Sequence, residues 1–157
     1  MLPPLEQLHS ALQRGIPGAS MTVESPNLVI APSDLVRVCQ FFKDTHAFRM
    51  DHVANLTAID YPPDRLEVIY HLYSMALKHG PIALKVKLPR ANPTVPSLVP
   101  VYRGAEYQER EVYDLYGVTF EGHPDLRRIL MWDEFKGYPM RKDYTPEDQD
   151  VIESGSR

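Results

Sequence analysis

Cysteine is almost absent from this chain of 157 residues, which contains only Cys39. One thiol cannot form an internal disulfide, and it cannot supply the set of thiolates that a typical iron–sulfur cluster requires. Cys39 also falls on the apolar face of a predicted helix, where a small buried thiol is the common arrangement. The sequence therefore gives no basis for a redox centre bound by this chain alone.

Long hydrophobic runs are missing as well. Charged residues or prolines interrupt each run before it reaches the roughly 18 to 20 apolar residues that a membrane-spanning helix needs. The segment Met1–Glu6 has neither the basic and apolar regions of a signal peptide nor the Arg- and Ser-rich character of an organelle presequence. We therefore expect the chain to stay in the cytoplasm.

Features that bind nucleotides or nucleic acids are also lacking. The glycines are isolated, and Pro17 stands where a phosphate-binding loop would need a backbone N–H. A net charge of −4 without a long Lys/Arg run argues against an extended basic face for nucleic acid. We therefore expect neither a nucleotide cofactor nor a nucleic-acid partner.

Motifs of hydrolytic enzymes are equally absent. No two of the six histidines share a helical face beside a carboxylate, as a zinc hydrolase motif requires. The serines lack the surroundings of a nucleophile elbow. A small standalone hydrolase that uses His and carboxylate side chains is therefore a remote alternative, and no metal site is expected.

The patterns that are present indicate one α+β domain. Apolar residues make up 43% of the chain and charged residues 24%, which is typical of globular proteins. Helical spacing predicts helices that begin at Leu5, Leu35 and Gly104. Turn residues and period-two alternation predict strands over residues 20–24, 27–31, 51–59, 66–73 and 82–88.

This order of elements, α-β-β-α-β-β-β-α, predicts a two-layer domain with a mixed sheet covered by helices on one face. Residues 89–100 are rich in proline and polar residues, which predicts an extended connector. We divide the chain into an α/β domain over residues 1–120 and an extended C-terminal tail over residues 121–157, within one structural unit. The tail is expected to lie on a surface of this chain or of a partner.

The last predicted helix is rich in charge. Glu106, Arg110 and Asp114 follow one another at intervals of four, which predicts ion pairs along one side of the helix. Glu109 and Glu111 are two residues apart and point to different sides, so they do not form an acid/base pair. The cluster therefore indicates a structural role.

The segment 109–130 reads EREVYDLYGVTFEGHPDLRRIL. It begins with Glu-Arg-Glu, and after two further residues come an acid and two hydrophobic residues. After six more residues comes a His, which is followed by a basic residue and a hydrophobic pair. This hallmark segment closely resembles that of the C subunit, or thirty-kilodalton subunit, of respiratory complex I. Residues 137–144, GYPMRKDY, form another block that is typical of the family.

The resemblance implies a cofactor-free subunit in the peripheral arm of a proton-translocating NADH:quinone oxidoreductase. Its partners would be the quinone-pocket subunit, called D or the forty-nine-kilodalton subunit, and the iron–sulfur subunits, while flavin and iron–sulfur clusters would lie in neighbouring chains. The arm would sit at the cytoplasmic face of the membrane. Related subunits occur in membrane-bound hydrogenases, in F420-type dehydrogenases and in the ferredoxin-driven enzyme of photosynthetic membranes, and the hallmark segment does not separate these.

The family motif also suggests where partners bind. The candidate motif and docking residues are Glu109, Arg110, Glu111, Asp114, His123, Arg127, Arg128, Arg141, Lys142 and Asp143. Arginine forks suit carboxylates or carbonyl groups of a partner, and exposed aromatic residues commonly anchor interfaces. Several aromatic residues lie in the last third of the chain, and each serves either the interface or the chain's own core. They are Tyr113, Tyr116, Trp132, Phe135 and Tyr138.

Overall fold

The computed structural model describes residues 2–146 and contains a five-stranded sheet with the order β1-β2-β5-β4-β3. The strands are β1 (Met21–Glu24), β2 (Asn27–Ile30), β3 (His52–Tyr61), β4 (Arg65–Ser74) and β5 (His79–Pro89). Neighbouring strands are antiparallel except β2 and β5, which pair in parallel. The sheet is therefore mixed, as predicted.

Alternation along β4 and β5 gives the sheet one apolar face. The buried hydrophobic residues of these two strands are Leu66, Val68, Tyr70 and Leu72, and opposite them Leu88, Val86, Leu84 and Ile82. The residues between them point to the other face, where Glu67 and Lys85 form an ion pair of 3.0 Å. Burial of the apolar face drives the helices onto that side of the sheet.

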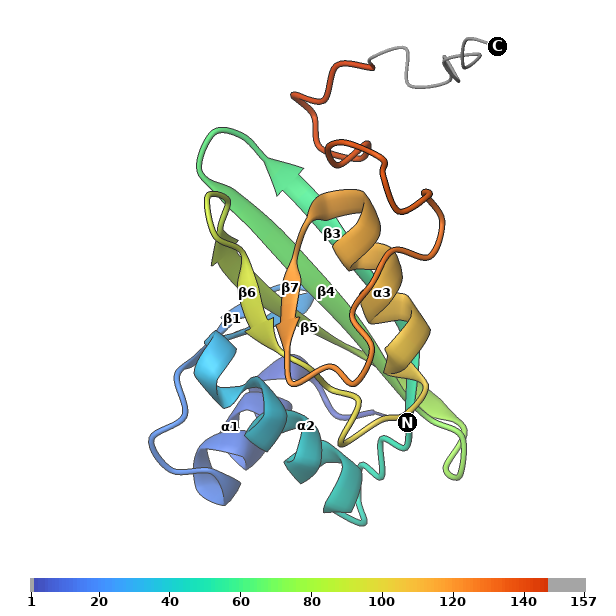
Figure 1. The fold of residues 1–157 in the computed structure, drawn as a ribbon. Coiled ribbons are helices and arrows are strands. Elements are labelled where there is room, and N and C mark those ends of the chain that lie inside the picture. Colours follow the sequence, from blue (N-terminus) through green and yellow to red (C-terminus); the bar gives the residue numbers. More distant parts are fainter. Residues whose placement is uncertain (1, 147–157) are drawn as a thin grey trace, which may run out of the picture.

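Three helices cover the apolar face: α1 (Leu5–Gly15), α2 (Leu35–Asp44) and α3 (Ala105–Tyr116), as Figure 1 shows. A short 3₁₀ turn at Pro32–Asp34 leads into α2. Burial raises the pKa of Tyr70 in β4, and the nearby Glu109 of α3 and Cys39 of α2 raise it further. Both helices therefore lie beside the same residue of the sheet, which confirms the predicted two-layer fold.

A second sheet of two strands was not predicted. β6 (Thr94–Pro96) and β7 (Thr119–Glu121) pair in parallel, and their central residues Val95 and Phe120 are buried. The sequence predicts only an extended connector over residues 89–100, because a strand of three residues is too short to show alternation. The pair fixes the chain on both sides of α3.

After β7, residues 122–146 form turns that run back along α3 (Figure 1). This is the described part of the predicted tail, and β7 itself crosses the boundary drawn at residue 120. Residues 147–157 of the predicted tail lie outside the described residues. Within residues 2–146, no helix is long and apolar enough to cross a membrane.

Candidate functional site

Three charged residues of α3 are buried in the fold. Glu109 and Asp114 have 0% of their surface exposed, and Arg110 has 6%. Charged side chains are rarely buried to this extent unless hydrogen bonds or ion pairs compensate for the lost water. All three belong to the hallmark segment; Arg110 and Asp114 bind the start of the tail, and Glu109 binds the segment before α3.

Asp114 organises the start of the tail. Its Oδ2 accepts hydrogen bonds from the backbone N–H groups of Ile129, Leu130 and Met131, at 3.0, 2.7 and 2.8 Å. Its Oδ1 accepts a hydrogen bond of 2.6 Å from Arg128. Burial opposes ionisation, but these hydrogen bonds outweigh it and lower the pKa of Asp114. The ionised carboxylate thereby fixes the backbone of residues 129–131.

Arg128 extends these contacts further along the tail. Its guanidinium group also donates to the carbonyl oxygens of Phe135 and Gly137, each at 3.0 Å. The same group lies over the rings of Phe135 and Tyr138, 5.4 and 5.6 Å from their centroids. A planar fork with several donors suits this arrangement, because it can bind several acceptors at once.

Arg110 binds the backbone of the tail, and its guanidinium group also lies 5.8 Å from the ring centroid of Tyr107 and 3.9 Å from the carboxylate of Asp125. It donates to the carbonyl oxygens of Arg127 and Arg128 at 3.2 and 3.0 Å. The predicted ion pairs of Arg110 with Glu106 and Asp114 are therefore wrong. Asp114 has Arg128 as its cation, and the side chain of Arg110 reaches across to the carbonyl groups that the tail brings alongside α3.

Glu109 binds the connector before α3. Its two oxygens accept hydrogen bonds from Ser97 Oγ and from the backbone N–H of Leu98, both at 2.6 Å. Burial raises the pKa of Glu109, although these two hydrogen bonds act in the opposite direction. Glu109 therefore joins α3 to the segment that follows β6.

His123 has a fully buried side chain with both ring nitrogens in hydrogen bonds. Its Nδ1 accepts a bond of 3.0 Å from the N–H of Asp125, so Nε2 carries the proton and contacts the carbonyl oxygen of Glu106 at 2.9 Å. Nε2 also lies 4.0 Å from a carboxylate oxygen of Glu109. His123 thus holds the turn after β7 against α3.

A second anchor ties the tail to the sheet. Arg90 donates to both oxygens of Asp60, at 2.7 and 3.1 Å, and to Asp143 at 2.5 Å. Asp60 also accepts a hydrogen bond of 2.8 Å from the backbone N–H of Lys142. The sequence places Asp143 and Lys142 in a family block, but it gives no signal for Asp60 and Arg90. They are 30 residues apart, and Asp60 belongs to a predicted turn.

The C-terminal end of α3 supplies further acceptors for the tail. Arg141 Nε donates to the carbonyl oxygen of Tyr116 at 2.7 Å, and the N–H of Met140 donates to that of Leu115 at 3.1 Å. A cation is favourable here because the free carbonyl groups at a helix end carry partial negative charge. Gly117 ends the helix with a φ of 73°, in the left-handed region that glycine tolerates.

The outer side of the tail exposes large apolar side chains. We call the set formed by Ile129, Leu130, Trp132 and Met140 the tail patch; their exposed fractions are 38, 57, 45 and 52%. Trp132 packs edge-on against Phe135 with 4.9 Å between ring centroids. Several large apolar side chains exposed on one segment commonly mark an interaction site. A polar, buried frame therefore holds an apolar outer surface.

The predicted site residues divide into two groups. Glu109, Arg110, Asp114, His123, Arg128 and Arg141 are buried or half-buried and make the internal contacts described above. Glu111, Arg127, Lys142 and Asp143 are exposed, although Lys142 and Asp143 also bind Asp60 and Arg90. The predicted aromatic set divides as well. Tyr113 and Tyr116 pack against the domain's own core, and only Trp132 is exposed. The arginine forks therefore bind this chain's own carbonyl groups to a greater extent than the sequence suggests.

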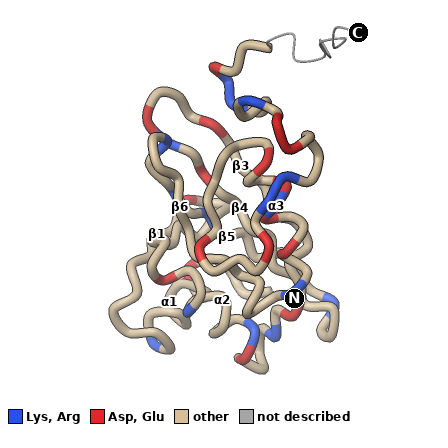
Figure 2. The backbone as a smooth tube through the Cα atoms, viewed as in Figure 1, with Lys and Arg blue, Asp and Glu red and all other residues tan. Residues whose placement is uncertain are grey.

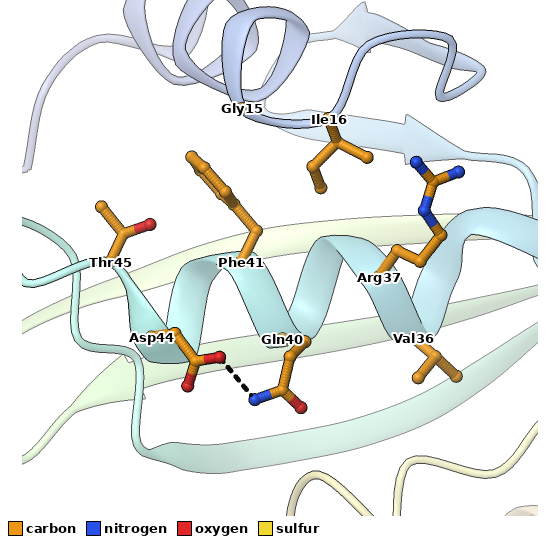
Figure 3. Close-up of a pocket in the computed structure, with 8 residues that line it drawn as sticks. All are labelled: Gly15, Ile16, Val36, Arg37, Gln40, Phe41, Asp44 and Thr45. Carbon is orange, nitrogen blue, oxygen red and sulfur yellow. Dashed lines mark hydrogen bonds between the residues drawn. The ribbon is translucent and has the colours of Figure 1, made fainter.

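A cavity of about 590 Å³ lies elsewhere, between the end of α1 and the outer side of α2 (Figure 3). Its polar side chains are already bound: Gln40 donates to Asp44 within the lining at 2.7 Å, and Arg37 donates at 3.0 Å to Asp34, which lies outside the lining. A ligand site usually offers polar groups that converge on the cavity. The polar frame of α3 and the tail is therefore the better candidate.

Comparison with known proteins relates this chain to one family. Residues 28–150 match the family model described as the 30 Kd subunit of the respiratory-chain NADH dehydrogenase. The chain is 44% identical over 136 residues to the C subunit of the NADH-quinone oxidoreductase of Moorella thermoacetica, covering 85% of this chain and 90% of that protein. It is 42% identical over 117 residues to the C 2 subunit of the Rhizobium meliloti enzyme, covering 73% of this chain and 63% of the relative.

Two solved structures share the fold. A trypsin-resistant fragment (1–134) of Nqo5 has a TM-score of 0.61 and 28% identity, covering 79% of this chain and all of the fragment. A chain of the membrane-bound sulfane sulfur reductase, an archaeal respiratory membrane complex, has a TM-score of 0.73 and 21% identity, covering 97% and 95%. With the family match across residues 28–150, the chain belongs to the family of the thirty-kilodalton subunit of the respiratory-chain NADH dehydrogenase.

Proposed function

We propose that this chain is a non-catalytic structural subunit in the peripheral arm of a proton-translocating NADH:quinone oxidoreductase. Relatives at 40 and 44% identity are named as C subunits of NADH-quinone oxidoreductases, which supports this assignment. Flavin and iron–sulfur clusters would be held by neighbouring subunits and not by this chain. Its contribution would be to position those neighbours beside the quinone pocket.

The tail patch carries this proposal. Exposing Leu130 and Trp132 is unfavourable in a free chain, because transfer of each apolar side chain out of water lowers the free energy. The buried hydrogen bonds of Asp114 nevertheless fix the backbone that presents them. A rigid apolar surface needs little ordering when it binds, which favours a permanent interface. We assign this surface to contact with the quinone-pocket subunit.

This arrangement gives the chain a peripheral position. The chain would be held at the cytoplasmic face of the membrane only through its partner subunits. These partners would include the iron–sulfur subunits. The patch and its frame are built from the same α3 and tail that hold the hallmark residues. The family motif would therefore be a structural element of the interface and not a catalytic site.

In a second candidate function, the chain has the same structural role in a different membrane complex. The fold recurs, at 21% identity, in a chain of the membrane-bound sulfane sulfur reductase, which supports an equivalent place in a related membrane complex. Membrane-bound hydrogenases and the F420-type or ferredoxin-driven oxidoreductases belong to this class of alternatives. The identity of the proteins that co-purify with this chain separates the candidates.

The test is deletion of the gene, followed by complementation with the wild-type chain or with a Leu130→Asp, Trp132→Ala double variant. We expect deletion to abolish the assembled, active quinone reductase and the double variant to restore little of it. Tyr107→Ala, at an aromatic residue that is 62% exposed on α3, serves as the matched control and should restore assembly. Full assembly without the chain would refute the proposal. Stoichiometric binding of flavin, nicotinamide or an iron–sulfur cluster to the purified chain would also refute it.

A further inference from the structure

The β4–β5 hairpin exposes two further large apolar side chains, apart from the tail patch. We call Met75 and Leu77 the hairpin patch; they are 62 and 40% exposed. Figure 1 shows this hairpin near the start of α3, whereas residues 129–131 of the tail bind Asp114 near the end of α3. The two patches therefore lie at different ends of the molecule.

Hydrogen bonds also fix the backbone of the hairpin patch, here through a carboxylate at the surface. The carboxylate of Asp51 accepts hydrogen bonds from the backbone N–H groups of Met75 and Ala76, at 2.8 and 3.2 Å. Ser74 Oγ accepts a bond of 3.1 Å from the N–H of Leu77. These contacts fix the backbone of the tip, so the apolar side chains point outward from a rigid loop.

Two cationic residues border the hairpin patch in an unusual backbone conformation. Arg49 and Lys78 have φ values of 42° and 53°, and they are the only non-glycine residues with positive φ among those the structure describes. Both are exposed. Glycine would adopt this conformation without strain, whereas a residue with a Cβ is strained there. Such strained positions commonly lie at functional sites.

We propose that the hairpin patch is a second docking site, for a protein partner that offers an apolar recess bordered by carboxylates. The apolar pair would fill the recess, and Arg49 and Lys78 would face the carboxylates. The proposal rests on the proposed function in that it requires a multi-subunit assembly. With partners at both patches, the chain would act as a bridge between two neighbouring subunits.

An anionic membrane surface fits the hairpin patch less well. Segments that bind such surfaces usually carry clusters of about 4 to 8 Lys or Arg residues, whereas two cations flank this tip. The chain as a whole has a net charge of −4, which opposes approach to anionic lipid. Figure 2 shows acidic and basic residues interspersed over the backbone, without one continuous basic stretch.

Site-specific photo-crosslinking within the complete assembly tests the proposal. The photoreactive residue p-benzoylphenylalanine replaces Leu77, with Leu130 as the tail-patch position and the exposed Gln13 of α1 as the background position. We expect Leu77 to capture a protein subunit at a peptide that contains Asp or Glu. A lipid adduct, or a yield at the Gln13 level, would overturn the proposal. If Leu130 still captured a subunit in that case, the proposed function would stand.

Charge variants separate docking from folding. Lys78→Glu should lower the Leu77 cross-link about tenfold, the change that ~1.4 kcal/mol of binding free energy produces. Lys78→Gly removes the same cation but also relieves the backbone, so it should weaken the cross-link while leaving the melting temperature of the purified chain unchanged or higher. Wild-type cross-linking in both variants would refute a role for the cation.

Discussion

Asp114 and Glu109 are buried carboxylates on the same helix, and their surroundings shift their pKa values in opposite directions. Asp114 accepts three backbone N–H groups and a guanidinium group, so its pKa lies below the ordinary value of 3.8. Glu109 accepts two hydrogen bonds and has no cation in hydrogen-bond contact, so burial raises its pKa above 4.5. The first carboxylate therefore stabilises the fold in its ionised form, whereas ionisation of the second is unfavourable.

Replacing Asp114 tests the frame directly. Asp114→Ala leaves Arg128 and three backbone N–H groups without their acceptor, and it should lower the free energy of unfolding by about 3 to 5 kcal/mol. Glu111→Ala, at an exposed position on the same helix, should change it by less than about 0.5 kcal/mol. Urea denaturation of the purified chain measures both values. Equal effects of the two substitutions would show that Asp114 does not hold the tail.

The raised pKa of Glu109 predicts a dependence of stability on pH. The folded state binds a proton more tightly than the unfolded state here, so the contribution of Glu109 to stability falls as pH rises from 4.5 through the folded pKa. Glu109→Gln removes this titration and can still bind Ser97 and Leu98. Its stability relative to wild type should therefore increase between about pH 4.5 and 7. A difference that stays constant over this range would contradict the raised pKa.

Among the elements, α3 and its end position the tail. A Cβ at Gly117 would lie 2.6 Å from the ring of Tyr138, whereas one at Gly18 would meet nothing within 4 Å. Both residues have positive φ, at 73° and 83°. Gly18→Ala should therefore cost about 1 kcal/mol for the backbone alone, and Gly117→Ala at least about 2 kcal/mol because the ring must also move. Thermal unfolding of the two variants compares them, and equal costs would mean that Tyr138 is not packed on α3.

The sequence predicts the longer elements because their patterns are local. Alternation over residues 66–73 and 82–88 identifies β4 and β5, and helical spacing identifies α1 and α2. The pairing of β6 with β7 joins residues 94–96 to 119–121, and no local pattern marks it. The parallel pairing of β2 with β5 is likewise a property of the folded chain.

The candidate site shows the same division between local and long-range information. The hallmark segment identifies Asp114, Arg110 and Arg128, but regular helical spacing predicts the wrong partners for them. Their true partners lie 7 to 18 residues away along the chain and depend on the path of the tail. Asp60 and Arg90 are missed for this reason as well, since only the assembled sheet brings them to Lys142 and Asp143.

In the molecule as a whole, hydrogen bonds to backbone N–H groups fix the two segments that expose large apolar side chains. Asp114 holds the backbone of residues 129–131 beside the tail patch, and Asp51 holds the backbone of the hairpin patch. A chain built in this way can bind partners without large rearrangement. The central claim is therefore that the tail patch is covered in the assembly.

Hydroxyl-radical footprinting tests this claim most directly, because Trp132 is the only tryptophan of the chain and Met140 is also readily oxidised. Both are about half exposed in the free chain, at 45 and 52%. The oxidation rates of these two residues are measured by mass spectrometry in the purified chain and in the purified membrane assembly. We predict that both rates fall several-fold in the assembly, and equal rates in the two samples would contradict the account.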